Sequence, residues 1–139
     1  MTRNSMTLEM DSRPENVGVA RLSVGAFASG LDFTLSELDE IKVAVSEAVT
    51  NAIVHGYPGT PGRVRIEAEI VDRELRLTIS DWGEGIADVA LARTPSYSTD
   101  PERMGLGFVF MESFMDELEV ASAVKEGTVV KMTKRCQGP

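Results

Sequence analysis

The sequence is poor in the features that define several large classes of protein. It contains a single cysteine, Cys136, so it can form no internal disulfide and no cysteine-based metal cage. No stretch approaches the ~20 apolar residues that a membrane-spanning helix needs. The first ten residues also lack the apolar segment of a secretory signal. We therefore expect a cytoplasmic protein with no membrane partner.

Basic residues are in the minority. Lysine and arginine number 14 against 22 aspartate and glutamate residues, which gives a net charge of −8. A protein that binds nucleic-acid phosphates normally carries a basic stripe, and none is present. We expect no direct binding to nucleic acid. An acidic surface suits a basic protein partner, although a merely solvated surface explains the same composition.

The length of 139 residues suits one domain, residues 1–139. Hydrophobic residues make up 42% of the chain, which is ordinary for a globular protein with one core. No internal repeat, low-complexity segment or linker divides the chain.

Two S/T-x-x-E patterns predict the starts of helices. Ser12 with Glu15 and Thr34 with Glu37 have the spacing of a capping box, in which each residue's side chain satisfies the other's backbone N–H. Apolar residues then recur at helical spacing in both stretches. The expected helices cover about 13–29, 35–55 and, later in the chain, 107–115.

Strands are predicted where apolar and polar residues alternate. The five segments are 6–11, 64–70, 75–79, 118–122 and 128–133, with hairpin turns at 72–73 and 125–127. Between 82 and 104 no periodicity persists, which is typical of a lid or binding loop. The order of elements predicts an α/β two-layer sandwich, with a mixed but mostly antiparallel sheet that helices cover on one face.

Glu47 and Asn51 lie four residues apart on the second predicted helix and so share one face. An amide oxygen can bind Mg²⁺, which commonly takes only one or two protein ligands beside phosphates and water. A neighbouring carboxylate can orient or deprotonate a nucleophile. The plain alternative is a solvated pair on a helix surface.

Asp81 has the same parity as the apolar residues of the strand 75–79, so its side chain should point toward the covered face. A buried carboxylate is costly without a hydrogen-bond donor. Gly83 and Gly85 follow and allow a flat ligand to approach closely. An exocyclic amine of a base could donate to Asp81. A strand-end turn, with the carboxylate bonded to nearby backbone N–H groups, is the equal alternative.

Gly105-Leu106-Gly107 precedes the third predicted helix. Glycines at a helix N-terminus expose N–H groups, and the helix dipole favours a phosphate there. Arg103 lies just upstream and can add a positive charge. The pattern is neither a P-loop nor a dinucleotide-binding fingerprint.

Taken in order, these motifs resemble the Bergerat ATP-binding fold of the GHKL superfamily, over nearly the whole chain. Within it, the sequence is most similar to the sporulation anti-sigma F factors. The stretches that carry the resemblance are VSEAVTNAIVHGY (45–57), DWGEGI (81–86), MGLGFVFMESFMDELEV (104–120) and EGTVVKMTK (126–134).

The resemblance implies a role for each matching residue. Glu47 would be the general base, Asn51 the Mg²⁺ ligand, and Asp81 the acceptor of the adenine amino group. Thr99 and Arg103, together with Ser98, would belong to a lid over the nucleotide. The remaining residues expected to bind ATP or ADP are Gly83, Gly85, Ile86, Gly105, Leu106, Gly107, Phe108 and Thr128.

The function that the resemblance implies has two parts. A homodimer would bind and inhibit an RNA polymerase sigma factor of the F type. The same protein would be an ATP-dependent serine-protein kinase that phosphorylates its anti-anti-sigma antagonist. Arg21 matches an arginine that contacts a partner in the family.

Other functions remain as alternatives. The chain could be a nucleotide-gated sigma-binding module without kinase activity, or an anti-sigma kinase for a stress-response sigma factor. A histidine kinase needs a phosphoacceptor histidine on a separate dimerisation helix, and the only histidine is His55, at the end of the predicted ATP helix. A mechanical GHKL ATPase needs a transducer domain, for which these 139 residues leave no room.

Overall fold

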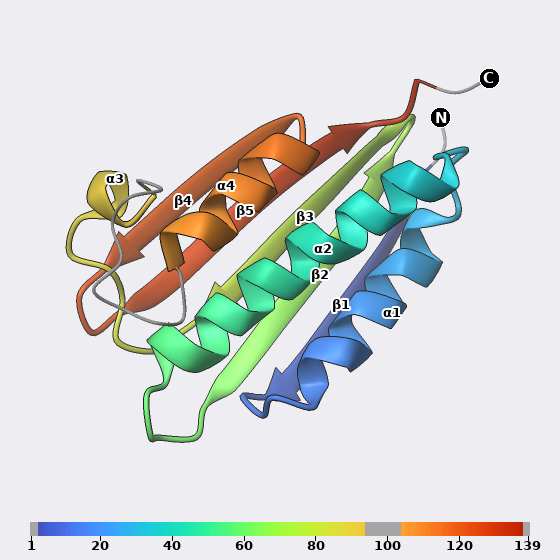
Figure 1. The fold of residues 1–139 in the computed structure, drawn as a ribbon. Helices are drawn as coiled ribbons and strands as arrows, with labels where there is room; N and C mark the ends of the chain where they lie inside the picture. The colour runs from blue at the N-terminus through green and yellow to red at the C-terminus, as the bar shows by residue number, and fades with distance from the viewer. Residues whose placement is uncertain (1–2, 94–103, 138–139) are drawn as a thin grey trace.

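A five-stranded sheet and a layer of helices make up the computed structural model, which describes residues 3–93 and 104–137 (Figure 1). Both layers follow from the alternating and helical patterns of the sequence. The elements in chain order are β1 (Arg3–Asp11), α1 (Asn16–Ala28), α2 (Leu35–Asn51), the π-helix η1 (Ala52–Gly56), β2 (Arg63–Val71), β3 (Glu74–Asp81), α3 (Val89–Ala92), α4 (Met104–Phe114), β4 (Glu117–Ala123) and β5 (Gly127–Arg135).

The strand order of the sheet is β1-β2-β3-β5-β4, and its four pairings are all antiparallel. The two-layer α/β class is confirmed, but the expected parallel component is absent from the described strands. The connection through α4 does make β4 run parallel to β3. The hairpin from β4 then inserts β5 between them, so these two strands are not neighbours.

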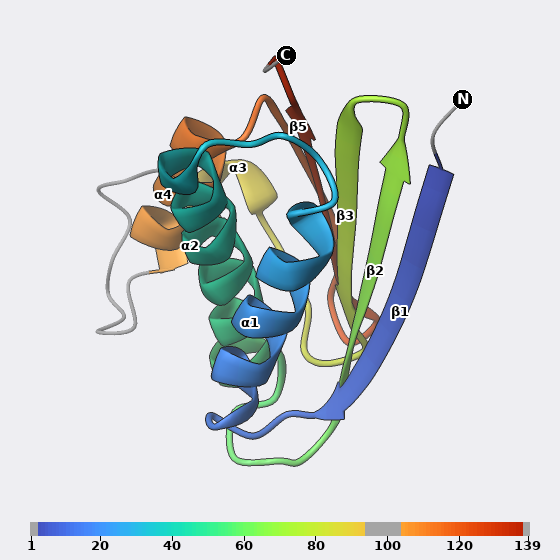
Figure 2. The same ribbon diagram turned by 90° about the vertical axis from the view of Figure 1, so that its right-hand side faces the viewer.

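The core lies between one face of the sheet and the helices α1, α2 and α4, as the side view shows (Figure 2). Alternation in β2, β3 and β5 places every second side chain on this face. The largest fully buried side chains come from both layers and include Ile41, Val45, Ile66, Leu75, Leu77, Ile79, Phe108, Met111 and Met132. None of the described helices is long and apolar enough to cross a membrane.

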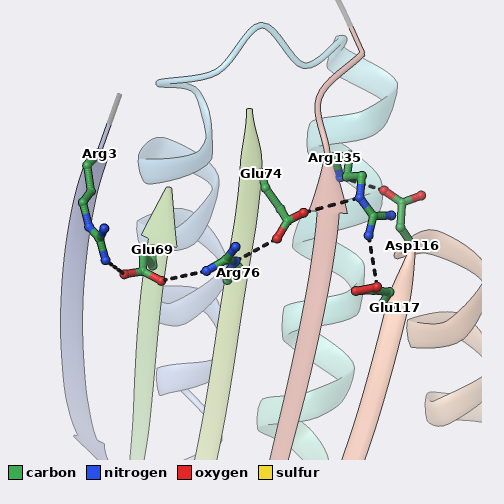
Figure 3. Close-up of polar contacts among 7 residues, drawn as sticks. All are labelled: Arg3, Glu69, Glu74, Arg76, Asp116, Glu117 and Arg135. Carbon is green, nitrogen blue, oxygen red and sulfur yellow. Dashed lines mark hydrogen bonds and ion pairs between the residues drawn. The ribbon is translucent and has the colours of Figure 1, made fainter. Parts of the chain in front are cut away.

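The opposite face of the sheet carries charged side chains, and none of the described helices covers it (Figure 2). A chain of ion pairs crosses all five strands there, and Figure 3 shows its members. The side chains are largely exposed, so water screens the attraction between them. The pairs are Arg3–Glu69, Glu69–Arg76, Arg76–Glu74, Glu74–Arg135 and Arg135–Glu117.

The capping box at the start of α2 is confirmed. The Thr34 hydroxyl accepts a hydrogen bond from the Glu37 N–H at 3.1 Å, and the Glu37 carboxylate accepts one from the Thr34 N–H at 2.8 Å. These bonds satisfy backbone donors that have no partner within the helix.

The capping box predicted for Ser12 and Glu15 is wrong. Helix α1 begins at Asn16, and no side chain caps it. The Ser12 hydroxyl instead accepts a hydrogen bond from the Gly62 N–H at 2.8 Å. This bond joins segments 50 residues apart in the sequence, so a local pattern could not reveal it.

Two helix ends also differ from the prediction. The helix starting at Leu35 does reach 55, but its last turn is the π-helix η1. Helix α4 begins at Met104, three residues before the predicted start at 107. Gly105 and Gly107 therefore lie in its first turn and not before it. The short helix α3 lies in a segment that the sequence predicted to be a loop.

Candidate functional site

A pocket opens where the end of α2, the end of β3, the start of β5 and the first turn of α4 meet. Elements that are distant in the sequence form its walls, since β3 and β5 pair antiparallel and α4 packs on α2. Its lining consists of Ala48, Asn51, Ala52, His55, Gly56, Ile79, Asp81, Gly85, Ile86, Phe108, Thr128 and Val130.

Asp81 is the charged group at the inner end of this pocket. It is 6% exposed and points toward the helix layer, as the parity of its strand predicts. The Gly83 N–H donates to its Oδ1 at 3.0 Å. Burial raises the pKa of Asp81, and hydrogen bonds from the backbone of Gly83 and Thr128 offset part of that rise. A further hydrogen-bond donor in the pocket would therefore stabilise the ionised form of Asp81.

Two glycines after Asp81 stand where no side chain fits. A Cβ on Gly83 would lie 1.9 Å from the Gly56 carbonyl oxygen, and one on Gly85 would lie 2.0 Å from that of Ala123. Gly85 also has a φ of +74°, in the left-handed region. The loop after β3 is therefore packed backbone to backbone against its neighbours.

Hydrogen bonds hold the same loop in place on both sides. The Glu84 N–H donates to the Gly56 carbonyl at 2.7 Å, and the Lys125 N–H donates to the Glu84 carbonyl at 2.6 Å. The Tyr57 hydroxyl accepts from the Trp82 N–H at 2.8 Å and donates to the Arg63 carbonyl at 2.8 Å. These bonds fix the wall of the pocket next to Asp81.

Glu47 and Asn51 lie beside the first turn of α4, where Gly107 faces them. A Cβ on Gly107 would be 3.0 Å from Glu47 Oε1 and 3.4 Å from Asn51 Nδ2. The Asn51 Nδ2 atom is buried and has no hydrogen-bond partner among the described residues. A carboxylate, a carboxamide and a helix N-terminus thus meet at one edge of the pocket.

The first turn of α4 contributes Gly105, Leu106, Gly107 and Phe108. The first four N–H groups of a helix have no partner within it, and the helix dipole places partial positive charge there. Phe108 is 1% exposed and lines the pocket, so it anchors this turn against the pocket. The geometry suits an anion at the Glu47–Asn51 side of the pocket.

The described residues offer few side chains that could bind a metal ion. Over residues 3–93 and 104–137 no group of three or more His, Cys, Asp or Glu residues could hold an ion. Asn51 could bind a Mg²⁺ only through its Oδ1 oxygen, with phosphates and water supplying most of the other ligands. The Asn51 atom that lacks a partner is Nδ2, a hydrogen-bond donor, which suits an anion.

The other predicted residues fall elsewhere. Arg21 is exposed on α1, which contributes nothing to the pocket lining. Ser98, Thr99 and Arg103, expected in the lid, lie outside the described residues.

Several residues of the site did not stand out in the sequence. Ala48 and Ala52, four residues apart, form the helix wall of the pocket, and Ile79 and Val130 form its sheet wall. Their apolar periodicity marked them only as core. Gly56 directly follows the helix predicted over 35–55, and its contact with Gly83 depends on tertiary structure.

Comparison with known proteins matches residues 10–134 to the family described as histidine kinase-like ATPase domain. An anti-sigma F factor from Clostridium kluyveri is 50% identical over 136 residues, which cover 96% of each chain. One from Halalkalibacterium halodurans is 51% identical over 135 residues, covering 95% of this chain and 92% of that one. The chain belongs to the anti-sigma F factor family of histidine kinase-like ATPase domains.

Solved structures agree with this family's fold. The RsbU and RsbW domains of Rv1364c from Mycobacterium tuberculosis align with a TM-score of 0.72 at 20% identity, covering 98% of this chain and 33% of that one. The catalytic domain of the histidine kinase ThkA aligns with a TM-score of 0.59 at 16% identity, covering 94% and 95%. Both alignments show that these domains share the fold of this member of the anti-sigma F factor family.

Proposed function

We propose that this chain is an anti-sigma factor of the F type that binds ATP and phosphorylates a serine of its anti-anti-sigma antagonist. One observation carries the proposal. Glu47, Asn51 and Gly107, from two helices far apart in the sequence, converge at the open edge of the pocket that Asp81 closes. The 50% identity to anti-sigma F factors over almost the full length supports the choice of partners.

Nucleotide binding places the base against Asp81 and the phosphates at the first turn of α4. The carboxylate accepts a hydrogen bond from the exocyclic amine of adenine, which satisfies a buried acceptor. Gly83 and Gly85 let the loop after β3 pack closely against Gly56 and Ala123, which fixes the wall beside the base. The N–H groups of the α4 first turn face the phosphates. Guanine lacks that amine at the same position and would leave the Asp81 carboxylate unsatisfied.

Phosphoryl transfer needs mainly positioning and charge neutralisation. Mg²⁺, when bound, would neutralise charge on the phosphates, and Asn51 is the residue that would hold it. Glu47 would accept the proton of the substrate serine hydroxyl as general base, a role typically worth ~10²–10⁴-fold in rate. Within the part of the chain that the structure describes, no hydrogen bond or ion pair occupies this carboxylate.

The family membership supports two proposed partners, a sigma factor and an anti-anti-sigma antagonist. We propose that a homodimer holds the sigma factor in the cytoplasm, and that the antagonist releases it and is phosphorylated in return. Arg21 would contact these partners, since it is exposed on α1 beside the exposed Leu22. An Arg21→Ala variant should lose sigma-factor binding in a pull-down while its affinity for ATP stays unchanged.

The kinase function is tested with Glu47→Gln, which keeps the shape of the side chain but removes the base. We expect ATP binding within about threefold of wild type by calorimetry, and a loss of phosphate transfer of at least ~10²-fold to the purified antagonist. Asp39→Asn, on the exposed start of α2, is the matched control. Unchanged transfer in Glu47→Gln would contradict the role of Glu47 as general base. No transfer in the wild type would favour a sigma-binding module without kinase activity.

A further inference from the structure

The hydroxyl of Ser122 lies on β4 directly behind the pocket, opposite Thr128 on β5. It contacts three polar groups. The Ile86 N–H lies 2.7 Å from Ser122 Oγ, the Gly127 carbonyl oxygen 2.9 Å and the Thr128 Oγ1 2.7 Å. Thr128 lines the pocket, whereas Ser122 does not.

The direction of these hydrogen bonds follows from counting protons. A backbone N–H can only donate, so Ser122 Oγ accepts from Ile86. A carbonyl can only accept, so the single Ser122 proton goes to Gly127. The remaining contact then requires the Thr128 hydroxyl to donate its proton to Ser122.

A threonine hydroxyl has one proton and two lone pairs. Once the Thr128 proton points to Ser122, only lone pairs remain for the pocket. Asp81, which pairs with Thr128 across β3 and β5, also presents lone pairs when ionised. The inner end of the pocket therefore presents two neighbouring acceptors to a ligand.

We propose that Ser122 is a positioning residue for base selectivity, because it holds the Thr128 hydroxyl as a hydrogen-bond acceptor toward the nucleotide. This inference rests on the proposed ATP binding. An amino group at position 6 of the purine has two protons and fits two acceptors that it contacts directly. A 6-oxo group has only lone pairs and is repelled by both. Ser122 thus contributes to the rejection of oxopurines without touching the base.

Removing the Ser122 hydroxyl frees the Thr128 proton. In Ser122→Ala the Thr128 hydroxyl can rotate and donate into the pocket, toward a 6-oxo group. One hydrogen bond of this kind is worth about 0.5–1.5 kcal/mol, or about two- to tenfold in affinity. The ratio of the dissociation constants for inosine triphosphate and ATP should fall by that factor.

The experiment measures the dissociation constants of Mg²⁺-ATP and Mg²⁺-inosine triphosphate by calorimetry for wild type, Ser122→Ala and Ser122→Thr. We expect the ratio to fall in Ser122→Ala and to stay at the wild-type value in Ser122→Thr, which keeps the hydroxyl. An equal loss of affinity for both nucleotides in Ser122→Ala would overturn the inference, because it would leave Ser122 only a structural role.

Thr128→Val gives a second test that does not require Ser122→Ala to fold. If Thr128 is an acceptor, its loss lowers the affinity for ATP, while the affinity for inosine triphosphate stays the same or rises because one repulsion is removed. If Thr128 instead donates into the pocket, the affinity of Thr128→Val for inosine triphosphate falls at least as much as its affinity for ATP. The inference then fails. Adding Ser122→Ala to Thr128→Val should not change the ratio further. A wild type that binds neither nucleotide would instead refute the proposed function.

Discussion

The backbone carbonyl of Gly56 accepts a hydrogen bond from the Glu84 N–H at 2.7 Å and stands where a side chain on Gly83 would be. This contact joins the end of η1, which continues α2, to the loop after Asp81, across 28 positions of sequence. Helix and loop are therefore held together before any ligand arrives. The pocket depends on this approach of two backbones.

Gly83→Ala should disrupt both the pocket and the fold. The new Cβ would fall 1.9 Å from the Gly56 oxygen, which forces one backbone segment to move. Overpacking of this kind typically costs about 1–3 kcal/mol, and ATP affinity should fall with it. Urea unfolding and calorimetry would measure the two effects. Gly18→Ala on α1, where the nearest atom is 3.7 Å away, is the control. It should leave ATP affinity unchanged and should not lower the stability, since alanine favours a helix more than glycine does.

The affinity for ATP should depend on pH through Asp81. Burial raises the pKa of this carboxyl above its usual value of 3.8, so it takes up a proton at a higher pH than an exposed aspartate does. Protonation removes an acceptor for the adenine amine, and ATP binding should weaken as the pH falls through that raised pKa. Asp81→Asn should bind ATP at least about tenfold more weakly and lack this step. A wild-type affinity that is flat over the same range would contradict the prediction.

The same shift predicts a trend in the stability of the protein without nucleotide. The folded state holds the Asp81 proton more firmly than the unfolded state, so the free energy of unfolding should decrease as the pH rises from 3.8 through the raised pKa. Other carboxyl groups titrate nearby. The measurement is therefore the difference between wild type and Asp81→Asn in urea unfolding at each pH, which should change only in this window.

Lys134→Met should lower stability without altering the nucleotide pocket. Lys134 is 8% exposed, and its ammonium group donates to the Phe114 carbonyl at the end of α4, at 2.6 Å, and lies 3.6 Å from Glu40 on α2. Loss of the donor removes a hydrogen bond from a charged group to this partly buried carbonyl, at a cost of about 1–3 kcal/mol. Glu40→Gln should lower the free energy of unfolding by less, since the Glu40 side chain is half exposed. Equal losses in the two variants would assign the effect to the ion pair.

Thr34→Ala should weaken the start of α2. The substitution removes the acceptor for the Glu37 N–H, and the loss of such a cap typically costs about 1 kcal/mol. Thr34→Ser keeps the hydroxyl and should retain most of the stability. Guanidinium unfolding curves for the three proteins would test this, and a Thr34→Ala midpoint equal to wild type would refute it.

Local patterns in the sequence were enough for most of the fold. Alternation placed β2 and β3 correctly, and the Thr34 capping box located the start of α2. The parity of Asp81 predicted that its side chain lies on the covered face. Each of these features depends on neighbours a few residues away, through the fixed periods of strands and helices.

The predictions that were wrong concern features that depend on residues distant in the sequence. Ser12 matched a helix cap, yet its hydroxyl binds Gly62, 50 residues away. The start of α4 was placed three residues late because its glycines are poor helix formers, and packing against α2 overrides that weakness. The sequence was also interpreted as a partly parallel sheet, since the insertion of β5 between β3 and β4 leaves no local signal.

The sequence by itself determined which residues alternate, where α2 begins and which carboxylate turns inward, because these properties arise from interactions within one turn or one strand. Tertiary structure alone decided that Gly107 faces Glu47, that Gly83 meets Gly56, and that Ser122 stands behind Thr128. Those contacts join separate segments at hydrogen-bond and van der Waals distances. They form only when the whole sheet and its helices pack together.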